Sequence, residues 1–164
     1  MSIKKQVDVL VIGAGPSGTI AASIMHQKGL DVQIVEKQRF PRFVIGESLL
    51  PRCMEALEEA KFLDAVKAKH FQQKDGAKFV MDGKVCDFSF EQQFTPGWNW
   101  TWQVNRAEFD KTLADECEKM GIPLQYETEV TDIKIFDDHS VTTVVTDGKE
   151  ETIRAKFIVD GSGY

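Results

Sequence analysis

The feature that most constrains the fold is a set of three glycines, Gly13, Gly15 and Gly18, placed between two contrasting segments. Before them, residues 7–12 are almost continuously apolar, which is typical of a strand buried in a parallel sheet. After them, residues 16–28 predict a helix that stops ahead of another glycine. The three glycines therefore lie where a buried strand turns directly into a helix.

A second predicted strand, residues 32–36, ends in an acid, Glu36, and completes a β–α–β unit. In such a unit the first glycine, Gly13, allows a sharp exit from the strand. Gly15 has no Cβ, so the backbone can approach a pyrophosphate, and Gly18 lets the helix pack closely on the strand. The combination predicts a site for a dinucleotide whose phosphates lie on the glycine turn.

The backbone of this turn is the expected phosphate-binding surface, because amides at a helix N-terminus point outward and the helix dipole favours negative charge there. The residues assigned to it are Gly13, Ala14, Gly15, Pro16, Ser17 and Gly18. The carboxylate of Glu36 is expected to accept both hydroxyls of a ribose. It would repel a 2′-phosphate, which disfavours NADP at this site.

Composition excludes several classes of protein. The chain has 164 residues, enough for one domain with a sizeable core, and its net charge of −6 with no basic block argues against a nucleic-acid partner. Cys53, Cys86 and Cys117 are widely spaced, so neither a metal site nor a disulfide framework is predicted, and a cytoplasmic location is expected. No segment approaches the ~20 apolar residues of a membrane helix, so no integral membrane segment is expected.

The rest of the chain alternates helical and strand patterns. Helices are expected over residues 49–60, 62–67 and 106–120, the first with Ser48 as its N-cap. A glycine-containing hairpin turn follows the second helix, and residues 124–160 have the apolar and β-branched character of antiparallel strands. The alternating tryptophans predict one further strand with all three indoles on one face: Trp98, Trp100 and Trp102.

Four segments together closely resemble the FAD-dependent monooxygenase superfamily. They are residues 13–18, the stretch FPRFVIGESLLP at 40–51, the stretch QVNRAEFD at 103–110 and the stretch FIVDGSG at 157–163. The nearest branch is similar to the tryptophan-halogenase-like and geranylgeranyl-reductase-like flavoproteins. The resemblance covers essentially the whole chain, and its most specific part is the GES-LLP stretch, which is additional to the general dinucleotide pattern.

The resemblance implies that the cofactor is FAD, with its adenosine half on the glycine turn and beside Glu36. It implies that two arginines and a glutamine lie near the pyrophosphate or ribityl chain, and that other residues contact adenine or border the flavin. The additional cofactor-site residues expected on this basis are Lys37, Arg42, Ser48, Gln103, Arg106, Val130, Asp160 and Gly161. An arginine fork also suits pyrophosphate oxygens on chemical grounds.

The fold implied is α/β: a Rossmann-like FAD-binding βαβ unit with an inserted antiparallel β-sheet. We expect the βαβ unit and the helix after the GES stretch in residues 1–74 and the start of a substrate-side sheet in residues 75–105. Residues 106–164 are expected to return to the FAD-binding domain with a β-meander. Members of the resembled family are about twice as long and carry a further Gly-Asp fingerprint, so the sequence is expected to be the N-terminal portion of a flavoenzyme.

The implied function is that of a flavin-dependent oxidoreductase: a monooxygenase, a halogenase-like enzyme or a double-bond reductase. It would act on an apolar or aromatic small molecule, with NAD(P)H or a flavin reductase as the source of electrons. No catalytic residue is identified. Halogenases use a lysine that carries activated chlorine, and Lys74 and Lys78 lie in the corresponding region, but a surface position at a hairpin entrance is the preferred interpretation of both.

Two other functions remain open. One is an NAD-binding dehydrogenase domain, against which the inserted hairpins argue because a plain Rossmann half continues with βα units. The other is a non-catalytic nucleotide-binding module that meets a protein partner through an exposed strand of tryptophans.

Overall fold

The structure, a computed structural model, describes residues 5–163, so residues 1–4 and 164 of the predicted first and third parts lie outside it. Its largest element is a six-stranded sheet with the strand order β7-β2-β1-β10-β9-β8. The strands are β1 (Lys5–Ile12), β2 (Val32–Val35), β7 (Leu124–Gln125), β8 (Thr128–Ile135), β9 (Ser140–Thr146) and β10 (Lys149–Asp160). Together with the helices, this sheet confirms the predicted α/β fold.

The sheet combines a parallel half with an antiparallel half, and β10 belongs to both. β1 pairs in parallel with β2 and with β10, and β2 pairs in parallel with β7. The first part of β10 pairs antiparallel with β9, which in turn pairs with β8 to complete a meander. In this register Ile12 lies between Val35 and Asp160, so three strand ends meet where the glycine turn begins.

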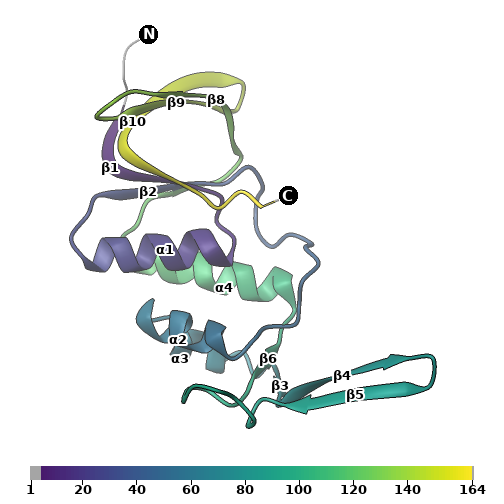
Figure 1. Ribbon diagram of the computed structural model, residues 1–164. Helices are drawn as coiled ribbons and strands as arrows, with labels where there is room; N and C mark the ends of the chain where they lie inside the picture. The colour runs from purple at the N-terminus through teal and green to yellow at the C-terminus, as the bar shows by residue number, and fades with distance from the viewer. Residues whose placement is uncertain (1–4, 164) are drawn as a thin grey trace.

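Helices cover one face of the sheet (Figure 1). They are α1 (Pro16–Gln27), α2 (Arg52–Glu59), α3 (Leu63–Lys67) and α4 (Arg106–Lys119). α1 and α4 lie side by side under the parallel strands, α2 and α3 lie beneath them, and the meander curls over the opposite side of the sheet (Figure 1). No helix within residues 5–163 combines the length and apolar character needed to cross a membrane.

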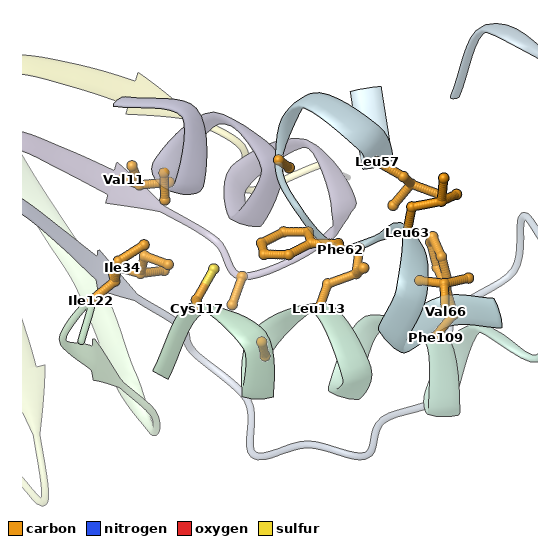
Figure 2. Packing of buried hydrophobic residues seen from close by; sticks show 14 of the residues in the cluster. Val11, Ile34, Leu57, Phe62, Leu63, Val66, Phe109, Leu113, Cys117 and Ile122 are labelled. Atoms are coloured by element: carbon orange, nitrogen blue, oxygen red, sulfur yellow. The ribbon is translucent and has the colours of Figure 1, made fainter. Parts of the chain in front are cut away.

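The main core lies between the sheet and the helices, and Figure 2 shows its centre. Val11 and Ile34 enter it from the sheet, Phe62 from the segment that joins α2 to α3, and Leu113 and Cys117 from α4. All five side chains are completely buried. Because burial of apolar area is the dominant favourable term in folding, this cluster holds α1, and with it the glycine turn, against the sheet.

A two-stranded hairpin projects from the body of the molecule (Figure 1). It consists of β4 (Gly76–Met81) and β5 (Lys84–Ser89), joined at Asp82 and Gly83. Both turn residues have positive φ, 50° and 74°, as a two-residue hairpin turn requires, which confirms the predicted hairpin. A separate small sheet pairs β3 (Gln72–Lys74) with β6 (Thr101–Gln103), so the predicted insert consists of two small antiparallel sheets.

The tryptophan strand is much shorter than expected, because only Trp102 lies in a strand. Trp102 is buried, Trp98 and Trp100 are half-buried, and all three pack against the main core. Successive indoles meet edge to face, with ring centroids 5.4 Å and 5.1 Å apart. The prediction of one strand with all three indoles on one face was therefore wrong. The indoles pack edge to face against the core instead, which does not need them to alternate along a strand.

The helix expected over residues 49–60 begins later, at Arg52, with Pro51 at its N-cap and no side-chain cap. The predicted N-cap residue, Ser48, instead forms an isolated antiparallel bridge with Gln103. The fixed φ of Pro51 is compatible with the first turn of a helix, and this local preference starts α2 without a side-chain cap. The prediction of Ser48 as a helix cap was therefore wrong.

Candidate functional site

Two of the three glycines shape the turn between β1 and α1. Gly13 has a φ of 93°, and a Cβ there would lie 2.5 Å from the carbonyl oxygen of Gly161. A Cβ on Gly18 would lie 2.0 Å from the carbonyl oxygen of Gly13. A Cβ on Gly15 would meet only Nη2 of Arg42, at 3.5 Å. Gly13 and Gly18 are therefore required by the fold itself, whereas Gly15 leaves open space beside an arginine.

The N-terminus of α1 opens onto that space. Gly15 is the N-cap, Pro16 follows it, and no side chain caps the helix. The first amides of a helix have no intrahelical acceptor, and the helix dipole adds about half a positive charge at this end. The turn therefore offers an uncapped, positively polarised surface of backbone N–H groups, which suits an anion such as a phosphate.

The carboxylate of Glu36 is fixed beside the same turn. Its Oε2 accepts a hydrogen bond from the amide of Ala14 at 2.8 Å, and its Oε1 accepts one from the amide of Gln38 at 2.9 Å. Only 6% of the residue is exposed. Because each carboxylate oxygen has two acceptor positions, both oxygens retain capacity for a ribose hydroxyl.

A cavity of about 340 Å³ lies over the meeting point of the three strand ends. It brings together five of the residues predicted from sequence: Gly13, Glu36, Lys37, Val130 and Asp160. The sequence interpretation missed Thr128, Glu129 and Ser162, which also line it. Thr128 and Glu129 belong to β8, where no local pattern marks them, whereas Ser162 lies in the FIVDGSG stretch that carried part of the resemblance.

Three charged residues that line this cavity, Lys37, Glu129 and Asp160, each have a partner that also lines it. Nζ of Lys37 lies 2.7 Å from Oε1 of Glu129, and this hydrogen bond raises the pKa of Lys37. The side chain and backbone of Ser162 both donate to Asp160, and these bonds lower the pKa of Asp160. The cavity thus has three carboxylates, those of Glu36, Glu129 and Asp160, and one cation, Lys37, which is paired with Glu129.

Arg42 reaches the glycine turn from the loop after β2. Its guanidinium lies over the ring of Phe40, 4.7 Å from the centroid, and its Nη2 is 3.5 Å from Oδ2 of Asp110. Its Nε is buried and has no hydrogen-bond partner. A buried N–H without an acceptor is costly, so the arrangement is suited to an acceptor that is brought by a ligand.

Arg106 is bound within the protein. Its Nε and Nη2 donate to the two carboxylate oxygens of Asp110, at 2.7 Å and 3.0 Å, and its Nη1 donates to the carbonyl of Gly46 at 3.2 Å. Asp110 is 1% exposed. The sequence interpretation did not select Asp110, although its spacing of four from Arg106 on a helix is a recognisable signal.

Ser48 and Gln103 line neither this cavity nor the hollow that Arg42 and Arg106 border. They pair with each other, and Nζ of Lys74 donates to Oγ of Ser48 at 2.5 Å and to the carbonyl of Leu49 at 3.3 Å. Lys74 is half-buried in this position. Lys78 forms an exposed pair with Asp87 on the projecting hairpin, as its surface interpretation expected.

Gly161 links the far end of the chain to the glycine turn. Its amide donates to the carbonyl of Ile12 at 2.8 Å. A Cβ on Gly161 would lie 3.2 Å from the backbone of Gly18, so the two glycines approach each other closely. The fold and the site together define a domain that binds a dinucleotide at the carboxyl ends of adjacent parallel strands. Within residues 5–163, no group of three or more His, Cys, Asp or Glu side chains is placed to hold a metal ion.

A sequence model of the FAD-binding domain family matches residues 6–164. The chain therefore belongs to this family of FAD-binding domains, and FAD is its cofactor.

Proteins similar to this chain include a brominase and a flavin-dependent halogenase. A 1H-pyrrole-2-carbonyl-[peptidyl-carrier protein] brominase from Pseudoalteromonas luteoviolacea is 34% identical over 99% of this chain and 39% of its own length. The crystal structure of a flavoprotein/dehydrogenase from Cytophaga hutchinsonii is 63% identical, with a TM-score of 0.93, over 98% of this chain and 40% of its own. The crystal structure of the flavin-dependent halogenase CmlS is 36% identical, with a TM-score of 0.89, over 98% of this chain and 30% of its own. The chain spans about a third of the length of the curated relatives it matches.

Proposed function

We propose that this chain holds the ADP half of FAD and forms the FAD-binding part of a flavin-dependent oxidoreductase. The glycine turn and Arg42 bind the diphosphate, Glu36 binds the ribose, and Val130 contacts adenine from the opposite wall of the cavity. The residues that make up the proposed site, including those beside the rest of the cofactor, are Gly13, Ala14, Gly15, Pro16, Ser17, Gly18, Glu36, Lys37, Arg42, Ser48, Gln103, Arg106, Val130, Asp160 and Gly161.

One observation carries the proposal. The buried Nε of Arg42 has no acceptor, and its guanidinium lies beside the uncapped N-terminus of α1 at Gly15. A diphosphate placed there would accept from both groups, since arginine and helix N-termini are the donors that phosphate oxygens prefer. The residues present therefore fit the cofactor of the family.

The residues of the proposed site do different work. Arg42 and the turn donate to the diphosphate, whereas Arg106 has three of its nitrogens engaged with Asp110 and Gly46 and so holds the loop that carries Arg42. Lys37, paired with Glu129, closes the rim of the cavity beside the ribose.

Bound flavin supplies hydride-transfer or oxygen chemistry, and this chain positions the cofactor and limits its contact with water. The whole protein would act on an apolar or aromatic small molecule, in the cytoplasm, with electrons from NAD(P)H or a flavin reductase. The division into residues 1–74, 75–105 and 106–164 is part of this proposal.

A second candidate is dehydrogenation of a small molecule, because the similar protein from Cytophaga hutchinsonii is a flavoprotein/dehydrogenase. An NAD-binding dehydrogenase domain is disfavoured by the FAD-binding family match. A module that binds a partner through exposed tryptophans is disfavoured because these indoles pack on the core.

The test is a titration of the full chain with FAD, followed by quenching of flavin fluorescence, with ADP, NAD and NADP as competitors. We expect FAD to bind, ADP to compete and NADP to compete poorly, because Glu36 repels a 2′-phosphate. Arg42→Gln should weaken FAD binding by about tenfold, the loss expected for one charge-assisted phosphate contact. A folded wild-type chain that does not bind FAD would disprove the proposed function.

A further inference from the structure

Two arginines converge on one buried carboxylate behind the glycine turn. Arg42 and Arg106 have side chains that are 16% and 14% exposed, and the carboxylate of Asp110 between them is 1% exposed. The three groups come from two places far apart in the chain, the loop after β2 and the first turns of α4. Their arrangement in the order cation, anion, cation leaves a net positive charge beside the turn.

We propose that Asp110 is a positioning residue that holds the guanidinium of Arg42 against the glycine turn, where it meets the diphosphate. The inference rests on the proposed function, because it assigns a role to a residue that acts on FAD only through Arg42. Asp110 itself does not touch the cofactor.

The geometry divides the work between the two arginines. Arg106 binds both oxygens of Asp110, at 2.7 Å and 3.0 Å, and fixes the carboxylate in orientation. Arg42 approaches Oδ2 only to 3.5 Å, which is an ion pair and not a short hydrogen bond. The carboxylate of Asp110 thus attracts the guanidinium of Arg42, while the N–H group at Nε of Arg42 has no hydrogen-bond acceptor. Phe40 supports the other side of the guanidinium at 4.7 Å.

Charge explains why the carboxylate is needed. Two guanidiniums held close together repel each other, and a largely desolvated cation without a counter-ion is costly. Glu47 lines the same hollow but lies in an exposed part of the loop, so it does not replace the buried carboxylate. Without Asp110, Arg42 would turn toward water and leave Gly15 without its neighbouring donor.

A competing role for Asp110 predicts the opposite change in affinity. If Asp110 merely competed with the diphosphate for Arg42, its removal would raise the local positive potential and tighten binding of an anion. The direction of the change in affinity therefore separates a positioning role from a competing one.

The experiment is a double-mutant cycle of Asp110→Asn and Arg42→Gln in the full chain, with dissociation constants for FAD from fluorescence quenching and for ADP from competition. We expect Asp110→Asn to weaken both ligands by about tenfold, as loss of a buried charge partner does, and to change affinity little in the Arg42→Gln background. Asp115→Asn, which breaks a half-exposed pair with Lys111 on the same helix, is the matched control and should leave both constants unchanged.

Equal or tighter binding by Asp110→Asn, or the same loss in the Arg42→Gln background, would overturn the proposal. If Asp110→Asn does not fold, as thermal unfolding without ligand will reveal, Asp110→Glu replaces it in the cycle. That variant keeps the charge but moves it by one methylene, and the same dependence on Arg42 is expected. A wild-type chain that is folded but does not bind FAD would instead refute the proposed function.

Discussion

The carboxylate of Glu36 and the backbone amide of Ala14 are joined by a hydrogen bond of 2.8 Å that connects the end of β2 to the glycine turn. Through this bond the acid that we propose binds the ribose also fixes the second residue of the turn. A single side chain thus joins the backbone that we propose binds the diphosphate to the carboxylate that we propose binds the ribose.

Replacing Glu36 by Gln should therefore affect stability and binding together. The neutral amide is a weaker acceptor for Ala14, and we expect the free energy of unfolding to fall by about 1–3 kcal/mol, the cost of weakening a buried charged hydrogen bond. FAD affinity should fall by about tenfold, because the ribose loses a charged acceptor.

Chemical denaturation and FAD titration measure the two effects of Glu36→Gln. The control is Glu129→Gln, which removes an exposed carboxylate of the same cavity that pairs with Lys37. Exposed pairs contribute about 0–1 kcal/mol, so this variant should be close to wild type in stability. A Glu36→Gln chain with unchanged stability would show that the bond to Ala14 contributes nothing.

Alanine at each of the three glycines should separate folding from binding. Gly13→Ala and Gly18→Ala place a Cβ 2.5 Å and 2.0 Å from backbone oxygens, so both should unfold at clearly lower denaturant concentrations. Gly15→Ala meets only Arg42, at an ordinary contact distance of 3.5 Å, and should keep its stability while binding FAD more weakly. Equal stability losses at all three positions would contradict the distinct role assigned to Gly15.

The cysteines should differ sharply in reactivity. Burial raises the pKa of Cys117 from 9.0 to about 12, whereas Cys86 is exposed on the hairpin. We expect a thiol reagent at about pH 8 to modify Cys86 rapidly and Cys117 only after unfolding, because the thiolate is the reactive form. Mass spectrometry of peptides after timed labelling gives the order.

The same shift predicts a pH dependence of stability. A thiol whose pKa is raised by folding contributes fully below its unfolded pKa of 9.0, and the contribution is lost as pH rises toward about 12. The free energy of unfolding should therefore decline more steeply over this range in the wild type than in Cys117→Ala. Parallel pH profiles for the two proteins would argue against a buried, protonated thiol.

The tryptophans should behave as core residues. Trp102 is 5% exposed, and Trp102→Ala should lower the free energy of unfolding by about 3–5 kcal/mol, the usual cost of truncating a large buried ring. Phe94→Ala, at a fully exposed aromatic in the neighbouring loop, is the control and should change it by no more than about 0.5 kcal/mol. Denaturant unfolding curves would decide, and similar small effects for both residues would contradict the packing described.

The features that could be predicted from the sequence are those set by residues close together in the chain. The β1–α1 turn, the Asp82-Gly83 hairpin and Glu36 all depend on residues close together in the sequence, and the structure has the turn, the hairpin and the adjacent strands as expected. The contact of Arg42 with Asp110 joins positions in different elements, so no spacing or periodicity reveals it. For the same reason the pairing of Ser48 with Gln103 replaced the helix cap that local propensity favoured.

The strand partners of β10 could not be predicted from the sequence. Its apolar, β-branched pattern predicts a strand, but the pattern does not tell that its first part pairs antiparallel with β9 and its last part in parallel with β1. Strand partners are set by packing across the whole sheet, and propensity alone does not determine them.

The contact between Gly161 and the glycine turn has a consequence for the order of events during synthesis. Residues 13–18 are made early, but the backbone that supports them arrives only with the end of β10. A nascent chain released before that point would have its phosphate turn without its support. Cofactor uptake by ribosome-bound chains of increasing length would therefore report when this late segment has left the exit tunnel.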